Sequence, residues 1–420
     1  MTRKAKLRGC TGLPADWRNL LLKDVVTINM GQSPPSSSYN KREVGLPFLQ
    51  GKSEFGEVFP EPNKWCSDPI KLANKRDILI SVRAPVGDVN IASCRCCIGR
   101  GLASLSVKNN ADSIFIFYLL RHLKSSINDQ GSGTIFKSIN KGILENFIIS
   151  LPPLSEQQQI AQVLSTVQEA RGRTQAVIDA ARELKKSLMK HLFTYGPVPL
   201  TEVVKVQLKE TDVGKLPVHW SLVHLRDLTL RAFGGGTPST KKPEYWDGPI
   251  PWTTTAIIKE EDIYLTKYQR GITEMGLEHS STKIAQKGTL LVGTRVGVGK
   301  AVVATFDIAI NQDLTAIKLN SDLANPEFIS NLFKTQLIQQ WFVSNKRGAT
   351  IKGVPREDLM TLKIPLPPFH EQQTIVHILQ TLDRKLQAEQ VREQTLETLF
   401  RTLLDNLMTG KIRVNHLEVP

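Results

Sequence analysis

The sequence predicts an α+β protein that contains two copies of one unit, each an α/β domain followed by a long helix. Two observations lead to this fold class. The segment "LPPLSEQQQIAQVL" at residues 151–164 reappears as "LPPFHEQQTIVHIL" at residues 366–379. Each copy opens a stretch in which apolar residues recur every three or four positions, the spacing of one face of a helix. With 420 residues, the chain is long enough to bury the cores of two such domains.

The match between the two copies extends well beyond this segment. Glu156 and Glu371 lie 215 positions apart, and Arg83 and Arg295 lie 212 positions apart. The order of the matches is kept and only the loop lengths differ. The chain is therefore a tandem duplication of a unit of roughly 200 residues rather than a solenoid of short repeats. Further matched pairs are Pro34 with Pro238, Gly87 with Gly299, Leu102 with Leu314, Lys137 with Lys352 and Pro152 with Pro367.

Each copy divides into a mixed part and a helical part. In the mixed part, short apolar runs at residues 77–82 and 288–293 predict buried strands, because Gly, Pro and Ser/Thr clusters separate such runs from one another. Helices are expected near the end of this part, at residues 113–127 and 326–342. The expected domains are residues 1–150 (first α/β domain), 151–200 (first helical spacer), 201–365 (second α/β domain) and 366–420 (second helical spacer).

The helical part of each copy predicts one long helix. Neither Gly nor Pro occurs between Glu371 and Thr409, and Gly172 is the weak position of the first helix. Ser155 is expected to cap that helix, with Gln158 as its capping-box partner. Two long helices with narrow apolar stripes bury them most simply as an antiparallel coiled-coil pair. The residues expected at this interface are Ile160, Val163, Val167, Val177, Leu184, Leu188, Ile375, Ile378, Leu382, Leu396, Leu399 and Leu403.

The charge of the chain favours a polyanionic partner. It has 54 Lys and Arg against 40 Asp and Glu, which gives a net charge of +14. In the cytoplasm the abundant polyanions are nucleic acids, although a basic surface can also serve only for solvation. A basic, internally duplicated protein matches the pseudo-symmetry of DNA. Two heads at the ends of a helical rod would read two separated sites, and those sites should differ because the α/β parts have diverged.

No targeting or membrane segment is expected. The basic start of the chain is followed by no apolar segment, and the longest apolar run is too short to span a bilayer. We therefore expect a cytoplasmic protein. Cys94, Cys96 and Cys97 could begin a metal site, but no second pair of ligands lies at zinc spacing, so reduced thiols in or beside a strand are the preferred interpretation.

Several segments, taken in order, resemble a known family. They are "GQSPPSSS" and "GGGTPSTKK" near the start of each copy, "ISVRAPVGD" and "GTRVGVGKA" in the middle, and "LENFIISLPPLSEQQQI" and "LMTLKIPLPPFHEQQTI" before the long helices. Along essentially its whole length the chain is similar to the DNA specificity subunit of type I restriction-modification enzymes. It departs from the usual pattern at Pro35 and at His370.

This resemblance implies a function that the residues alone do not give. The two α/β parts would be target recognition domains, each reading one half of a split site in double-stranded DNA. The helices would set the spacer and bind two methyltransferase subunits, and motor-nuclease (restriction) subunits would join for cleavage. S-adenosylmethionine, ATP and magnesium would be held by those partners, and this chain itself would bind no cofactor. No membrane partner is implied.

Catalytic motifs were sought and are not found. Each Pro-Pro pair lacks the preceding Asn or Asp of an adenine methyltransferase motif. The segment 293–301 imitates a phosphate-binding loop but has one residue too many, and Ala301 stands where Ser or Thr should hold magnesium. Asp24 and Asp227 match between the copies, which favours a structural role. Two alternatives nevertheless remain at this stage, a self-sufficient DNA methyltransferase and a structural scaffold that does not bind DNA.

The candidate DNA contacts are mostly cations. Arg83 and Arg295 hold the same place in both copies and are expected at the DNA backbone, because the half-sites should differ. Lys137 and Lys352 are also matched and are expected at phosphates, with a plain surface role as the alternative. The cations that are not shared, and so are candidates for reading sequence, are Lys52, Arg95, Arg100, Lys241, Lys242 and Lys300. The tryptophans Trp17, Trp65, Trp220 and Trp252 could stack on bases but are better explained as core residues.

Overall fold

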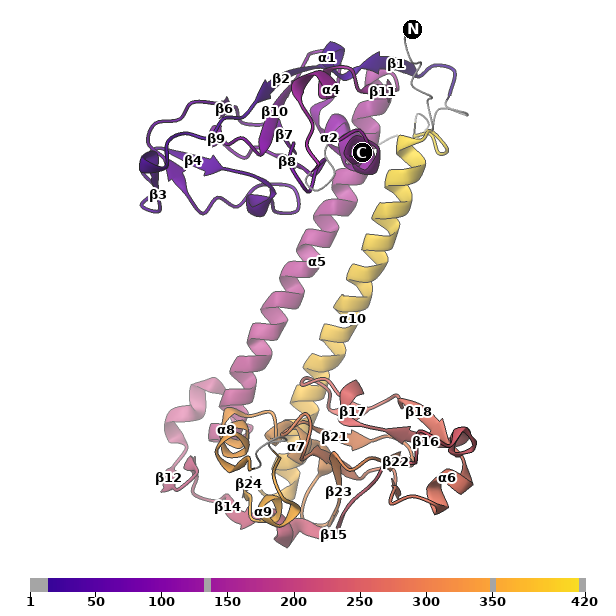
Figure 1. The fold of residues 1–420 in the computed structure, drawn as a ribbon. Coiled ribbons are helices and arrows are strands. Elements are labelled where there is room, and N and C mark those ends of the chain that lie inside the picture. Colours follow the sequence, from indigo (N-terminus) through magenta and orange to yellow (C-terminus); the bar gives the residue numbers. More distant parts are fainter. Residues whose placement is uncertain (1–13, 132–136, 348–352, 415–420) are drawn as a thin grey trace. The chain divides into compact units, whose positions relative to one another are not determined.

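The computed structural model describes residues 14–131, 137–347 and 353–414. Contacts divide these residues into two compact units. Unit 1 holds the described residues up to Ala176 and those from Gln390 onward, and unit 2 holds Val177–Glu389. The long helices α5 (Leu154–Tyr195) and α10 (Phe369–Met408) each contribute one part to either unit (Figure 1). The predicted α+β fold with two sheet-rich domains and two long helices is confirmed.

Unit 1 is built on two sheets and one closing strand pair. Its strands are β1 (Arg18–Leu21), β2 (Val26–Met30), β3 (Tyr39–Asn40), β4 (Leu46–Leu49), β5 (Trp65–Cys66), β6 (Leu72–Ala73), β7 (Ile78–Ser81), β8 (Val89–Ile91), β9 (Cys96–Ile98), β10 (Leu102–Val107) and β11 (Ile148–Leu151). Its short helices are α1 (Leu22–Val25), α2 (Ser113–His122), α3 (Lys124–Asp129) and α4 (Lys141–Glu145). The sheet orders are β2-β10-β7-β8 and β3-β5-β4-β9-β6, and β1 pairs with β11.

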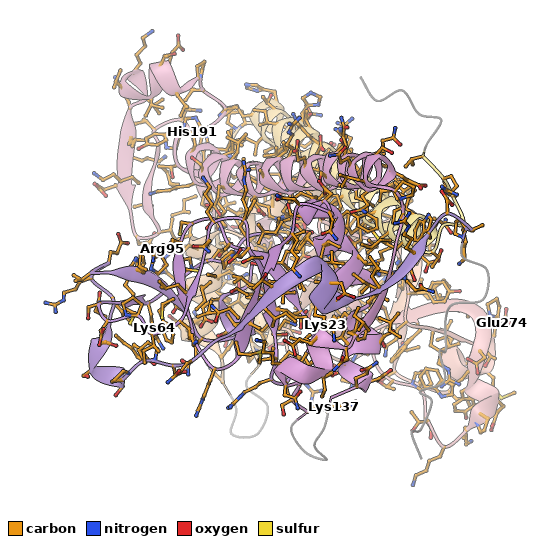
Figure 2. The ribbon with its side chains drawn as sticks, turned by 90° about the horizontal axis from the view of Figure 1, so that it is seen from above. Lys23, Lys64, Arg95, Lys137, His191 and Glu274 are labelled. Carbon is orange, nitrogen blue, oxygen red and sulfur yellow. The ribbon has the colours of Figure 1, made fainter. Side chains whose placement is uncertain are left out.

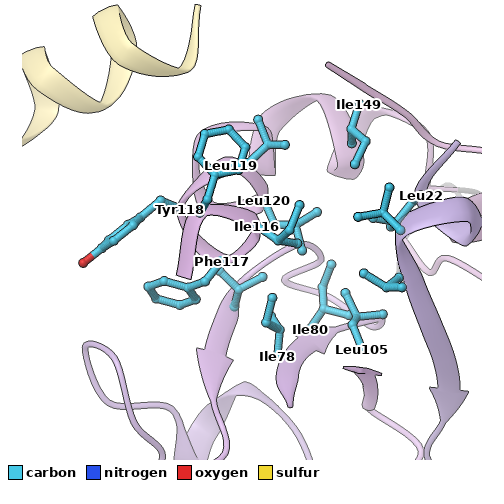
Figure 3. Packing of buried hydrophobic residues seen from close by; sticks show 14 of the residues in the cluster. Leu22, Ile78, Ile80, Leu105, Ile116, Phe117, Tyr118, Leu119, Leu120 and Ile149 are labelled. Carbon is cyan, nitrogen blue, oxygen red and sulfur yellow. The ribbon is translucent and has the colours of Figure 1, made fainter. Parts of the chain in front are cut away.

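The core of unit 1 lies between its first sheet and helix α2. Ile116 and Leu120 of α2 pack over Ile78, Ile80 and Leu105 of the strands, and all five are fully buried (Figure 3). Strand β7 is buried on both faces, which explains why its sequence is a continuous apolar run rather than an alternating one. The strand predicted at residues 77–82 is confirmed. The end of this strand places the following loop, residues 82–88, at the edge of the sheet.

Unit 2 repeats this plan with longer strands. Its strands are β12 (Leu208–Thr211), β13 (Gly214–Pro217), β14 (Ser221–His224), β15 (Thr229–Gly234), β16 (Trp246–Thr253), β17 (Tyr264–Leu265), β18 (Arg270–Ile272), β19 (Lys283–Ala285), β20 (Leu290–Gly293), β21 (Ala301–Ala304), β22 (Ile308–Ile310), β23 (Leu314–Leu319) and β24 (Lys363–Leu366). Its short helices are α6 (Glu274–Glu278), α7 (Pro326–Leu332), α8 (Gln336–Asn345) and α9 (Arg356–Met360). The sheet orders are β15-β23-β20-β21-β17 and β18-β16-β22-β19, with the additional pairs β14-β24 and β12-β13.

Within each unit, the parts of α5 and α10 run antiparallel and touch through both apolar and charged side chains. In unit 1, Arg171 of α5 is 11% exposed and lies 3.4 Å from Glu393 of α10. Phe400 of α10 receives the guanidinium of Arg171 on its ring at 5.7 Å and that of Arg121 at 5.1 Å. In unit 2, Lys185 pairs with Asp383. The helix contact is therefore interrupted by ion pairs and is not a continuous apolar seam.

The predicted interface positions divide into two groups. Val177, Leu184 and Leu399 are exposed, and the prediction that they lie in the helix contact is wrong. Along α5, buried positions lie one residue further on, at Leu164, Gln168 and Ile178, because a true helix drifts from a strict heptad pattern. The remaining predicted positions are buried or half-buried, namely Ile160, Val163, Val167, Leu188, Ile375, Ile378, Leu382, Leu396 and Leu403.

In unit 1, the glutamate of the repeated EQQ segment joins three parts of the chain. Glu156 lies in the first turn of α5, and its side chain is 2% exposed. Arg413, which follows α10, donates from Nη2 to Glu156 at 2.8 Å and to Asp16 at 2.6 Å. These hydrogen bonds, first to Glu156 and then to Asp16, raise the pKa of Arg413 above its usual value. The start of one long helix and the segment before β1 are therefore both bound by the guanidinium of Arg413, which follows the other long helix.

In unit 2, the equivalent glutamate uses other donors. Glu371 accepts a hydrogen bond from Trp220 Nε1 at 3.0 Å and lies 2.8 Å from His219 Nε2. Gly196, which follows α5, lies against the same carboxylate. Trp17, the counterpart of Trp220, has no hydrogen-bond partner for Nε1 among the described residues. Both tryptophans are buried, so the prediction that they pack in the core is confirmed.

The first glutamine of each EQQ segment attaches the long helix to a helix of the domain. Gln157 Oε1 accepts the backbone amide of Asp112 at 2.9 Å, and Gln372 Oε1 accepts that of Asn325 at 2.9 Å. The Asp112 and Asn325 side chains cap α2 and α7 respectively. The motif is present twice because it makes the same junction twice.

The predicted helix cap at Ser155 is wrong. Helix α5 begins at Leu154, so Ser155 already lies inside its first turn, and Gln158 is exposed. The helix starts directly after the proline pair, and its first hydrogen bond runs from the Gln157 amide to the carbonyl of Pro153 at 3.0 Å. By contrast, the structural role predicted for the matched aspartates is confirmed, since Asp24 and Asp227 each accept a backbone amide three residues earlier.

Replacing Gly172 by alanine should stabilise the protein. This glycine lies inside α5 with open space where a Cβ would stand, so the substitution lowers the entropy of the unfolded chain without a clash. We expect the free energy of unfolding to rise by about 1 kcal/mol, measured by urea denaturation. Gly288→Ala is the matched control, because its Cβ also meets nothing but its φ is +83°. The free energy of unfolding of that variant should fall by about 1 kcal/mol. A change of the same sign and size in both variants would contradict the explanation.

The two EQQ glutamates should respond differently to loss of charge. Glu156→Gln replaces two carboxylate oxygens that both accept from Arg413 by an amide with a single acceptor oxygen and no charge, and should lower the free energy of unfolding by about 2 kcal/mol. Glu371→Gln keeps an oxygen that can accept from Trp220, and should cost less than about 1 kcal/mol. Thermal unfolding of both variants tests this, with the exposed Gln373→Ala as control. A larger loss for Glu371→Gln would contradict the assigned contacts.

Candidate nucleic-acid interface

In each unit, several loops gather where strands of the two sheets end. We call this region the loop edge. In unit 1 it consists of residues 31–38, 50–54, 82–88, 99–101 and 137–139. Backbone hydrogen bonds between these loops hold them in a fixed arrangement, and exposed side chains project from them.

The turn between β9 and β10 is the centre of the loop edge in unit 1. Residues 99–102 form this turn, which is closed by a hydrogen bond of 3.0 Å between its ends. The amide of Val82 donates to the carbonyl of Gly101 at 2.9 Å, and the amide of Gln32 donates to that of Ile98 at 3.0 Å. The loops after β7 and β2 are therefore fixed to the two sides of the turn.

Unit 2 reproduces this framework at the equivalent positions. Residues 311–314 form the turn between β22 and β23, closed at 3.4 Å. The amide of Thr294 donates to Asp313 at 2.8 Å, and the amide of Gly236 donates to Ile310 at 3.1 Å. The Asn311 side chain braces this turn by donating to Asp313 Oδ2 at 2.7 Å. The loop edge of unit 2 thus consists of residues 235–242, 294–300, 311–313 and 353–354.

The matched cations of unit 1 lie next to each other. Arg83 is exposed and forms an isolated bridge with Ser138, the neighbour of Lys137. The amide of Ile139 donates to Val82 at 3.0 Å, which fixes this neighbourhood. Lys137 is 43% exposed and has Asp129 at 4.0 Å, at the limit of an ion pair. The structure therefore brings together two cations that the sequence placed 54 positions apart.

Unit 2 has the same junction. The amide of Val354 donates to the carbonyl of Thr294 at 2.7 Å, next to the exposed Arg295. Gly353 approaches this strand end so closely that a Cβ would stand 2.7 Å from the carbonyl of Thr294. Lys352, the counterpart of Lys137 and the other predicted phosphate contact, lies outside the described residues.

The loop that carries Lys241 and Lys242 is held by two buried tryptophans. Trp252 Nε1 donates to the carbonyl of Gly236 at 3.2 Å, and Trp246 Nε1 donates to that of Ser239 at 3.1 Å. Trp252 is buried, as the core interpretation predicted, and its ring nitrogen also supports the loop. Lys241 is exposed, whereas Lys242 donates to the Tyr245 hydroxyl at 3.0 Å, and this hydrogen bond raises the pKa of Lys242.

Two other predicted contacts lie on the loop edge but have internal partners. Lys300 donates to the carbonyl of Ile258, so one donor of its ammonium is used inside the unit, and the DNA contact expected there stays a prediction. Lys52 lies 2.9 Å from Asp88, which also binds Lys124 at 2.7 Å. The charge of Asp88 is therefore neutralised by these two lysines.

The remaining predicted contacts are Arg95 and Arg100. Both are exposed, but Arg95 precedes β9 and Arg100 follows it, so they lie at opposite ends of one strand. Figure 2 shows Arg95 well apart from Lys137 of the loop edge. The structure therefore brings Arg100 together with Arg83 and Lys137 but leaves Arg95 elsewhere.

The described cysteines offer no sign of a metal centre. Burial raises the pKa of the Cys96 thiol to about 12 and that of Cys97 to about 11. Cys94 is exposed at the end of the loop before β9. No group of three or more metal-ligating side chains occurs within residues 14–131, 137–347 and 353–414. Over the same ranges, no helix is long and apolar enough to cross a membrane.

Sequence reasoning missed one group on the loop edge. Gln312 is exposed at the second position of the 311–314 turn, and Thr237 donates from its hydroxyl to Gln312 Oε1 at 2.8 Å. The signal was present in the repeat, because Gln312 stands 212 positions after Arg100, the same interval that separates Arg83 from Arg295. Glutamine carries no charge and is common at surfaces, so its type alone does not indicate a binding site.

A duplicated α/β fold with two cationic loop edges and two long helices defines a family of DNA specificity proteins. The chain matches the family "Type I restriction modification DNA specificity domain" over residues 14–178 and 217–398, and it belongs to this family. The resemblance seen in the sequence is confirmed.

Related proteins carry the same designation. The chain is 46% identical over 185 residues to the MjaX type I restriction enzyme specificity subunit of Methanocaldococcus jannaschii, a match that spans 43% of this chain and 44% of that protein. It is 23% identical over 417 residues to the MjaVIII specificity subunit of the same organism, covering 97% of this chain and 95% of that protein. The crystal structure of the type I S subunit from M. genitalium aligns with a TM-score of 0.63 at 17% identity, covering 97% and 99% of the two chains.

Proposed function

We propose that each unit of this specificity subunit binds one half of a split site in double-stranded DNA through its loop edge. One observation carries this proposal. The two units repeat the same backbone framework around a turn, and each presents an exposed arginine, Arg83 or Arg295, at the same place beside it. Both half-sites share the phosphate backbone of DNA. A backbone framework and an arginine that are present in both units are therefore expected to bind phosphates.

The long helices serve two purposes in this proposal. They set the unread spacer between the half-sites, and they bind two methyltransferase subunits. Exposed apolar side chains on each helix support docking, since large apolar groups at a surface can contribute to a binding site. These side chains are Val177, Leu184, Val391 and Leu399. The domain limits expected at residues 150, 200 and 365 belong to the same proposal.

The chemistry of this system belongs to the partners. The methyltransferase subunits would bring S-adenosylmethionine, and restriction subunits with ATP and magnesium would join for cleavage of DNA in the cytoplasm. This chain would contribute recognition only. The two alternatives, a self-sufficient methyltransferase and a scaffold without DNA binding, are not favoured, because family membership and the paired loop edges both point to recognition.

Sequencing of methylated bases in the host genome tests the proposal directly. We expect methylated adenines within one motif of two short specified parts separated by an unspecified stretch, and loss of this motif when the gene is deleted. Methyl transfer by the purified chain alone would favour the self-sufficient enzyme. Absence of DNA binding even with the methyltransferase subunits present would favour the scaffold.

Arg83→Ala and Arg295→Ala should weaken binding to all sequences about equally. Loss of one phosphate contact should also reduce the slope of log affinity against log salt by about 1. Titration of the methyltransferase complex with specific and nonspecific duplexes at several salt concentrations measures both effects. Lys75→Ala and Lys287→Ala are matched controls, because these exposed lysines lie at the opposite ends of β7 and β20. Loss of discrimination with unchanged nonspecific binding would contradict a phosphate role.

A further inference from the structure

The tip of the central turn is occupied by a different side chain in each unit. Arg100 is the second residue of the 99–102 turn, and Gln312 is the second residue of the 311–314 turn. Both side chains are exposed. Because the backbone around the two turns is the same, these side chains leave the loop edge from equivalent points, and a difference in what they bind arises from the side chains themselves.

The loop after β2 or β15 supports each tip with a hydroxyl. Ser33 Oγ accepts the backbone amide of Arg100 at 3.2 Å. Thr237, which is equivalent to Ser33, donates to Gln312 Oε1 at 2.8 Å. Each tip is therefore held in place on its inner side. The guanidinium of Arg100 is available to a ligand. In Gln312, the amide nitrogen and the second lone pair of the oxygen are available.

The two side chains have different hydrogen-bond codes. A guanidinium carries donors only, and in the major groove it pairs with O6 and N7 of guanine, which are two acceptors. A glutamine amide carries one acceptor and a donor group, and it pairs with N6 and N7 of adenine. Arginine gains nothing from the N6 donor of adenine, and glutamine would leave one group unpaired against guanine.

We propose that Arg100 and Gln312 are equivalent specificity-determining residues, with Arg100 reading a guanine in one half-site and Gln312 reading an adenine in the other. This inference rests on the proposed function, namely binding of DNA at the loop edges. Arg83 and Arg295, beside the same turns, anchor the backbone in both half-sites. Recognition is then divided between a shared anchor and an exchangeable tip in each unit.

Base preferences of the intact complex test the assignment. The chain with its methyltransferase subunits selects from a duplex DNA library with randomised half-sites, and the bound DNA is sequenced. Arg100→Gln should change one position of one half-site from G·C to A·T. Gln312→Arg should change one position of the other half-site from A·T to G·C. Each change should amount to roughly 10- to 100-fold in relative preference, the value of one bidentate base contact.

Further variants separate reading from folding. Arg100→Ala and Gln312→Ala should remove the preference at the same single positions and leave the other half-site unchanged. Arg100→Lys should keep guanine with a smaller preference, because lysine still donates to it. Lys75→Ala and Lys287→Ala, away from the loop edge, should select the wild-type site.

The possible results distinguish this inference from the function on which it rests. Wild-type preferences at every position in both exchange variants, with DNA still bound, would overturn the roles of Arg100 and Gln312 and leave the proposed function intact. A change in both half-sites from a single substitution would also overturn them. A wild-type complex that selects no sequence would instead reject the proposed function.

Discussion

The structure depends on a carboxylate in the first turn of each long helix, which is buried at Glu156 and half-buried at Glu371. A charge out of water must be paired or hydrogen-bonded, so Glu156 and Glu371 each draw donors from distant parts of the chain. In unit 1 the donor follows the other long helix, and in unit 2 it directly precedes β14, the strand that pairs with β24. Each carboxylate thereby fixes where a domain joins a helix. The sheets of the same domain in turn hold the loop edge.

The two glutamates occupy equivalent positions but accept hydrogen bonds from different donors. The two loop edges likewise keep one backbone arrangement with different side chains. Glycines flank the turn tip in unit 1, whereas Asn311 and Asp313 brace it by side-chain hydrogen bonds in unit 2. The backbone arrangement is nevertheless equal. A duplicated fold can therefore keep its framework through several chemistries while the exposed positions change. Under the proposed function, this separation of framework from tip would allow one fold to bind two unlike half-sites.

Where the structure gives a predicted residue other neighbours than expected, the cause is that a residue type does not reveal its neighbours. Lys300 looked like a free cation of a loop, but the carbonyl of Ile258 binds it. Arg95 and Arg100 looked equivalent in a basic stretch, yet a strand separates them. Leu184 looked like a seam residue because it is apolar, whereas Lys185 and its partner Asp383 occupy the contact. An ion pair inside a helix contact cannot be found from apolar spacing alone.

The sequence by itself determined the duplication, the two long helices, the buried strands and the family, because these depend on spacing along the chain and on local patterns. It also indicated that Arg83 and Arg295 occupy one equivalent place. Only the tertiary structure decided what the EQQ glutamates bind and which side chains share a loop edge with Arg100. These facts depend on hydrogen bonds between residues tens to hundreds of positions apart, such as Arg413 with Glu156. No periodicity along the chain records such pairings, since only folding brings the partners together.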